Sequence, residues 1–124
     1  MPEEVPLIEQ FLYLTTTGWR SGQPHEIEIW FVEYKGRFYI VSEHRERSHW
    51  VRNVRQHPAV TWRIGNRAAG EFAGPITTGT ARPLDPTVEP ERHAAVAALM
   101  DAKYDWSDGL IVELTPAGED SGEA

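Results

Sequence analysis

Short runs of β-branched and aromatic residues, separated by glycine and proline, constrain the fold of this chain more than any other sequence feature. In residues 25–34, apolar side chains alternate with polar ones, which predicts one strand with a buried and an exposed face. Lys35-Gly36 then predicts a tight hairpin turn. Further strands are predicted at residues 11–17, 37–42, 60–64, 71–82 and 110–114.

Two segments carry the pattern of helices instead. Ser48 is predicted to cap a short helix that runs to Arg55, and Pro58 prevents that helix from continuing far. A second helix is predicted over residues 90–104, where Pro90 suits the first turn. Its apolar stripe consists of Val96, Met100 and Tyr104.

Glycine and proline interrupt the predicted strand at residues 71–82, at Gly74-Pro75 and again at Gly79. Proline cannot donate to a sheet ladder, and glycine inside a strand marks a bulge or a bend. A bent strand suits a sheet that curls. The sequence therefore predicts a mainly β fold, a small antiparallel barrel with two helices as lids.

Length and composition fit one globular domain. The chain has 124 residues, of which 40% are hydrophobic, and we assign residues 1–116 to the domain. Residues 117–124 are small and acidic, so we expect a disordered tail. The absence of cysteine excludes disulfides, thiolate metal sites and a cysteine nucleophile. With an acidic start and no long apolar run, we expect a soluble, cytoplasmic protein without membrane insertion.

The charge is negative but unevenly distributed. A formal net charge of −7 argues against nucleic acid as a partner, because binding a polyanion needs a basic surface. Five arginines nevertheless gather in one part of the chain: Arg45, Arg47, Arg52, Arg55 and Arg63. A local basic patch on an acidic protein indicates a small anionic ligand.

The first candidate site is the turn within TTTGWRSGQP, where Gly18 and Gly22 bracket Arg20 and Ser21. Successive N–H groups in such a turn can form an anion-binding concavity, to which both side chains add donors. The alternative is a plain hairpin with an exposed arginine, which these residues alone favour because glycine-bracketed turns are common. This turn does not match a phosphate-binding P-loop.

The second candidate site is the segment SEHRERSHWVRNVRQHP, which leaves a strand and enters the helix after Ser48. A helix N-terminus carries partial positive charge and free N–H donors, and Arg45 and Arg47 would reinforce it as a phosphate site. A solvated helix with charged flanks is the alternative. Trp30 lies on the polar side of its strand, where it would line a stacking groove or meet a partner subunit.

No side chain is assigned a catalytic role. The five histidines lack metal-ligand spacing, so no metal site is expected. There is no GxSxG motif, and Ser21 has no evident base partner, which makes a hydrolase a poor interpretation.

Three segments together resemble the deazaflavin (F420)-dependent nitroreductase and F420H2-dependent quinone reductase family, within the split β-barrel flavoproteins related to pyridoxamine-phosphate oxidase. They are LTTTGWRSGQPHEIEIWFV, GRFYIVSEHRERSHWVRNVRQHPAVTWRIG, and the second helix with DGLIVELTP. The most specific pieces are the turn TTxGxxSGxP, which ends at Pro24, and the helix motif W-x-x-N-[LV]-x-x-x-P from Trp50 to Pro58.

This resemblance implies a Greek-key split barrel that forms homodimers, with a redox cofactor in grooves between the subunits. It implies a reductase that transfers a hydride from reduced F420 to a small acceptor such as a quinone, a nitro compound or an activated alkene. In that case the cofactor carries the chemistry and the protein orients it. The implied cofactor-binding residues, with Trp30 as a wall of the acceptor groove, are Arg20, Ser21, Gly22, Trp30, Ser42, Glu43, His44, Arg45, Arg47, Trp50 and Asn53.

Two alternatives to F420 remain open. Trp19, Gln23 and His25 stand where the family commonly has arginine or lysine, and F420 carries a phosphate and an oligoglutamate tail. The first is FMN in a split-barrel oxidoreductase, which would require less positive charge in the binding site. A barrel that binds flavin or haem without catalysis is the other alternative.

Overall fold

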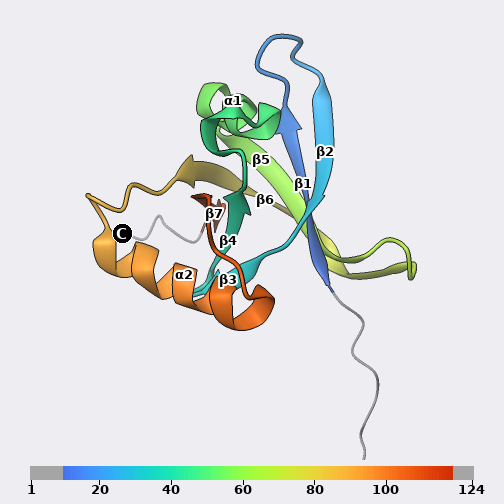
Figure 1. The fold of residues 1–124 in the computed structure, drawn as a ribbon. Coiled ribbons are helices and arrows are strands. Elements are labelled where there is room, and N and C mark those ends of the chain that lie inside the picture. The colour runs from blue at the N-terminus through green and yellow to red at the C-terminus, as the bar shows by residue number, and fades with distance from the viewer. Residues whose placement is uncertain (1–9, 119–124) are drawn as a thin grey trace, which may run out of the picture.

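The computed structural model describes residues 10–118, which form one curled sheet and two α-helices (Figure 1). In chain order the elements are β1 (Phe11–Thr17), β2 (Pro24–Ile29), β3 (Val32–Tyr34), β4 (Arg37–Ser42), the short 3-10 helix η1 (Arg45–Arg47), α1 (His49–Gln56), β5 (Ala59–Asn66), β6 (Glu71–Pro83), α2 (Pro90–Tyr104) and β7 (Leu110–Pro116). The predicted mainly β architecture with two helices is therefore confirmed.

The seven strands lie in the order β2-β1-β5-β6-β7-β4-β3, and every neighbouring pair is antiparallel. β2 and β3 are consecutive in the chain, yet they form the two opposite edges of the sheet. The sheet therefore curls until its edges approach each other, with α1 beside the end of β1 and α2 across β3 and β4 (Figure 1).

The prediction of a single strand over residues 25–34 is wrong. The segment is divided at Trp30 and Phe31 into β2, which pairs with β1, and β3, which pairs with β4. At the division, the Phe31 N–H donates to the Tyr104 hydroxyl at 3.2 Å, and Lys103 donates to the Phe31 carbonyl at 2.9 Å. Alternation of side chains continues through the break, so it could not reveal the change of partner.

The turn and bulge predictions are confirmed. Lys35 and Gly36 have φ of 53° and 80°, the positive values that a two-residue hairpin turn of type I′ requires. The register of β5 against β6 shifts between Trp62 and Ile64, where three residues of β6, 74–76, lie opposite one residue of β5. The proline-containing interruption in the sequence therefore is the bulge that bends this long strand.

Hydrophobic side chains form two clusters, one on each face of the sheet. Inside the curl, Trp62 packs with Leu14, Val112 and neighbouring residues. On the other face, Tyr39 and Ile111 pack with α2. Because β4 and β7 contribute to both clusters, their sequences read as continuous apolar runs rather than alternating ones.

The helices occupy the predicted positions, with one correction to the capping of α1. Ser48 is the N-cap residue, but its side chain makes no capping hydrogen bond. Its Oγ instead lies 2.6 Å from the Oγ of Ser42. In α2, Val96 and Met100 are buried as predicted.

The far end of the predicted tail, residues 119–124, lies outside the described residues. Within them, Ala117 still donates its N–H to the Thr78 carbonyl at 2.8 Å. Neither α1 nor α2 has the length and apolar character needed to cross a bilayer.

Candidate functional site

Two adjacent hollows lie between the β1–β2 hairpin, the loop after β4 and the two helices. The larger is a cavity of about 600 Å³ with aromatic walls formed by Phe11, Trp30, Trp50, Tyr104 and Trp106. Its polar lining consists of Glu28, Ser42, Glu43, His44 and Ser48. The smaller hollow, of about 320 Å³, is lined mainly by the β1–β2 turn and the first turns of α1. Trp50 lines both, so the two hollows are neighbours.

Asn53 joins the β1–β2 turn to α1. Its Oδ1 accepts the backbone N–H of Trp19 at 2.8 Å, and its Nδ2 donates to Thr16 Oγ1 at 2.9 Å. Asn53 is only 4% exposed, so both bonds are shielded from water. The asparagine of the helix motif therefore fixes where the turn and its arginine stand relative to α1.

The backbone of the β1–β2 turn corrects the prediction of an open N–H concavity. The Gly18 N–H donates to the Gln23 carbonyl and the Gly22 N–H to the Gly18 carbonyl, while the Trp19 N–H is held by Asn53. Ser21 Oγ accepts the Gln23 N–H at 3.1 Å. Most donors are thus used inside the protein, and the turn presents its side chains instead.

Positive charge converges on the indole of Trp19. The guanidinium of Arg20 lies 5.1 Å from the ring centroid, and that of Arg52, from α1, lies 5.8 Å from it. Trp19 and Arg20 both line the smaller hollow, together with His25 and His49. Glu26 also lines this hollow, but its carboxylate is paired with Arg67. Arg20, which makes no ion pair within the described residues, therefore makes this hollow the basic end of the site, where an anionic group would be attracted.

The loop after β4 is closed by two serines. Ser42 Oγ donates to the carbonyl of Arg45 at 2.9 Å, so the short contact between the two hydroxyls uses the proton of Ser48. Arg45 has a φ of 54°, and its guanidinium forms an ion pair with Asp108 at 3.0 Å. This arginine therefore faces the loop before β7 at the protein surface.

Trp30 forms part of an aromatic wall. Its ring stacks on that of Tyr104 with centroids 4.4 Å apart and planes 4° from parallel. The Tyr104 hydroxyl donates to the Phe31 carbonyl at 3.0 Å, which fixes the ring. Trp30 remains 38% exposed, so part of its surface still faces the cavity and the solvent.

The structure brings together most of the residues that the sequence singled out. Trp30, Ser42, Glu43, His44 and Trp50 line the larger cavity. Arg20, Ser21, Trp50 and Asn53 line the smaller hollow. Gly22, Arg45 and Arg47 line neither of the two.

Sequence reasoning missed several residues of the site. Glu28 lines the larger cavity and accepts a hydrogen bond from the buried hydroxyl of Tyr13 at 2.6 Å. Burial, followed by this hydrogen bond, raises the pKa of Tyr13. Tyr104 and Trp106 reach the cavity from the end of α2 and the following loop. Their apolar character indicated only residues of the hydrophobic core, because no local sequence pattern shows which loop an aromatic ring faces.

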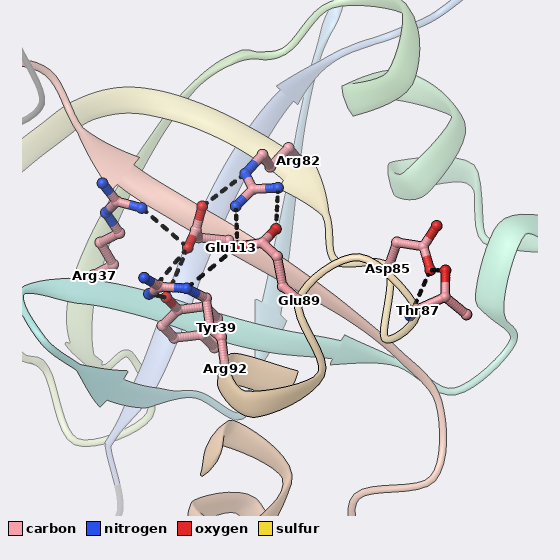
Figure 2. Close-up of polar contacts among 8 residues, drawn as sticks. All are labelled: Arg37, Tyr39, Arg82, Asp85, Thr87, Glu89, Arg92 and Glu113. Atoms are coloured by element: carbon pink, nitrogen blue, oxygen red, sulfur yellow. Dashed lines mark hydrogen bonds and ion pairs between the residues drawn. The ribbon is translucent and has the colours of Figure 1, made fainter. Parts of the chain in front are cut away.

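A second charged cluster, which the sequence also did not reveal, lies away from both hollows (Figure 2). Glu113, on β7 and 1% exposed, accepts from Tyr39 at 2.7 Å and from Arg82 at 2.8 Å. Arg37 and Arg92 complete its surroundings. Burial, reinforced by the bond to Glu113, raises the pKa of Tyr39 to about 12. The one signal in the sequence was a single acid within an otherwise apolar strand.

Comparison with known proteins identifies both a family and a fold. The family model described as F420H(2)-dependent quinone reductase matches residues 3–105. Comparison with curated protein sequences gives no match.

Solved structures resemble the chain at low sequence identity. The heme storage protein HutZ from Vibrio cholerae has a TM-score of 0.68 at 17% identity, over 86% of this chain and 80% of that one. A proposed pyridoxamine 5'-phosphate oxidase from Listeria innocua has a TM-score of 0.63 at 21% identity, over 88% and 85%. A structure described as an F420 reductase has 0.59 at 17%, over 86% and 85%. These likenesses confirm the predicted split-barrel fold.

Proposed function

The chain belongs to the F420H(2)-dependent quinone reductase family and is an F420-using oxidoreductase, and from this premise we propose that it transfers a hydride from reduced F420 to a small quinone, nitro compound or activated alkene. The observation that carries the proposal is the pair of adjacent hollows that share Trp50. The smaller hollow contains Arg20 and suits the anionic end of the cofactor, and the larger has aromatic walls and suits its planar ring.

The smaller hollow suits the phosphate-bearing part of F420. Within residues 10–118, Arg20 makes no ion pair, and its guanidinium lies over the Trp19 ring. Its guanidinium is thus available for a charge-assisted hydrogen bond to an anion. Ser21 lies beside it, and Asn53 holds the turn in place. We propose that the side-chain donors of Arg20 and Ser21 compensate in part for the turn positions that hold Trp19, Gln23 and His25 in place of arginine or lysine.

The larger cavity suits the ring and the acceptor. Its volume is within the range of small-molecule sites, and its walls are largely aromatic. When bound, F420 supplies the hydride, and the protein supplies orientation and exclusion of water. Trp50 and the segment of Ser42, Glu43 and His44 would position the ring, while Trp30 would form the wall beside the acceptor. No side-chain nucleophile is required by this chemistry.

Three of the implied residues would act from outside the hollows. Gly22 has a φ of 74°, which glycine adopts without strain, so it would shape the turn that presents Arg20. Arg45 and Arg47 belong to the loop that borders the larger cavity. We propose that Arg47 contributes to the positive field that attracts the cofactor, and that Arg45, paired with Asp108, holds this loop in place.

We further propose that the protein is a homodimer whose subunits together enclose the site. The larger cavity is open to solvent in one chain, and two large apolar side chains remain exposed: Trp30, between β2 and β3, and Ile76, on β6. Light scattering coupled to gel filtration tests this part of the proposal. A monomer at micromolar concentration would contradict it.

The function is tested with a binding panel and a turnover assay. Purified protein is titrated with F420, FMN, FAD and haem, and oxidation of reduced F420 is then followed with menadione and with a nitroaromatic compound. We expect tight binding of F420 and acceptor-dependent oxidation. Binding of FMN without F420 would instead support a flavin enzyme. Binding of haem or flavin with no turnover would support a binding protein without catalysis.

A further inference from the structure

The two hollows differ in charge as well as in size. The smaller one is lined by Arg20, His25 and His49, and also by Glu26, whose charge is paired with Arg67. Among the described residues, no arginine or lysine lines the larger cavity, whose ionisable side chains are Glu28, Glu43 and His44, with the phenol of Tyr104. A molecule in the larger cavity is therefore surrounded by carboxylates rather than by cations.

Glu28 is held in a fixed position at the cavity wall. The hydroxyl of Tyr13, itself 1% exposed, donates to Glu28 Oε2, and it accepts the N–H of Arg67 at 2.8 Å. The nearby guanidinium of Arg67 bonds to Glu26, which occupies much of its charge. The carboxyl group of Glu28 is thus anchored at the cavity wall and makes no ion pair within the described residues.

Glu43, in the loop after β4, adds a second carboxylate to the lining of the cavity. Within residues 10–118 it forms no ion pair, because the neighbouring Arg45 is turned to Asp108. The same cavity is lined by the stacked pair of Trp30 and Tyr104, which offers an apolar surface for a planar molecule. The cavity therefore combines a flat aromatic wall with two carboxylates.

We propose that Glu28 and Glu43 make this enzyme select its acceptor by charge, so that neutral and cationic planar acceptors are reduced and their anionic analogues are rejected. This inference rests on the proposed function, because it concerns the acceptor of that same site. The reaction is unchanged: reduced F420 is oxidised as a hydride and one proton pass to the quinone, which becomes the hydroquinone. Like charges a few ångströms apart in a partly solvated site reduce binding about three- to tenfold.

The test compares three naphthoquinones that differ in charge: 1,4-naphthoquinone, its 2-sulfonate, and a derivative with a trimethylammonium group. We measure kcat/KM with each at low ionic strength, for the wild type and for Glu28→Gln, Glu43→Gln and the double variant. Ratios between variants cancel the intrinsic reactivity of each quinone. We expect each substitution to raise kcat/KM for the sulfonate about threefold relative to the neutral quinone, and to lower it for the cationic one.

Glu33→Gln is the matched control, since Glu33 is exposed on β3 and lines neither hollow. In this variant, the kcat/KM of each charged quinone relative to the neutral one should be the same as in the wild type. Added salt should weaken the discrimination between quinones in the wild type but not in the double variant. Glutamine can still accept the Tyr13 hydrogen bond, so Glu28→Gln should fold. Glu43→Gln alters an exposed side chain and provides an independent test.

A second measurement needs no turnover. Quinones quench tryptophan fluorescence, and Trp30, Trp50 and Trp106 line the cavity, so affinities for the three quinones can be measured without F420. If the neutral quinone is reduced but neither substitution changes the kcat/KM of the charged quinones relative to the neutral one, the proposal of selection by charge is wrong and the reductase function stands. If no quinone is reduced, the proposed function fails, and the binding ratios still decide whether Glu28 and Glu43 discriminate by charge.

Discussion

The cluster around Glu113 and the hollow beside Arg20 both contain arginine, but their charges are satisfied in opposite ways. Glu113 is enclosed by Tyr39 and by arginines from β4, β6 and α2, with its nearest partner at 2.7 Å (Figure 2). Arg20 stands at a solvent-facing hollow and, among the described residues, has no carboxylate partner.

The difference shows that composition alone does not distinguish a structural charge from a ligand-binding one. In the Glu113 cluster, each charged group has an oppositely charged partner in the same chain, so the cluster contributes to folding. Beside Arg20, the compensating charge is missing and a ligand can supply it. The three predictions below test this contrast.

The largest expected effect is on stability, from Glu113→Gln. This substitution removes the carboxylate and leaves three guanidinium groups around a neutral amide, which we expect to lower the free energy of unfolding by about 3–5 kcal/mol. Urea denaturation measures it. Glu33→Gln makes the same chemical change at an exposed position and should cost less than about 0.5 kcal/mol. Equal effects for the two variants would show that the cluster does not stabilise the fold.

The next effect is on binding, from Arg20→Ala. If Arg20 pairs with the phosphate of F420, its loss should weaken F420 binding by about 1.5–3 kcal/mol, with little change in unfolding free energy. Isothermal titration calorimetry measures the affinity. Arg55→Ala is the control, because Arg55 is half-exposed, lies near Glu46 and lines neither hollow. A loss of stability without a loss of affinity would place Arg20 with the structural charges instead.

The smallest effect is a dependence of stability on alkaline pH. A phenol whose folded pKa is raised keeps its proton longer in the folded state than in the unfolded one. Its stabilisation is therefore fully present below pH 10 and declines as pH rises toward about 12, the pKa of Tyr39. We expect a loss of about 1–2 kcal/mol over this window. In Tyr39→Phe, unfolding free energies measured by denaturation should fall less steeply, and identical slopes would contradict the assignment.

The candidate site was most predictable at and beside the two motifs. The turn motif supplied Ser21 and the neighbouring Arg20, and the helix motif supplied Trp50 and Asn53, all of which line the smaller hollow. Arg45 was selected for its charge and for its place in the chain, but its side chain is turned to Asp108. A charge in a loop shows that a cation is present, and it does not show which carboxylate the fold brings near.

Glu28 shows the opposite error, a residue that lines the cavity but was not selected from the sequence. Its place on the polar side of an alternating strand indicated an acid that faces solvent. The structure places it at a cavity wall because Tyr13, its register partner on β1, donates to it, and because the chain turns away at Trp30.

The amino-acid sequence by itself determined the strands and turns of this protein, including the bulge at residues 74–76 and the positions of α1 and α2. These depend on alternation, glycine and proline, which act over a few neighbouring residues. Only the tertiary structure decided that residues 25–34 serve both edges of the sheet, and that Tyr39 meets Glu113, 74 positions away. Such pairings depend on the register of the whole curled sheet, which no local pattern encodes.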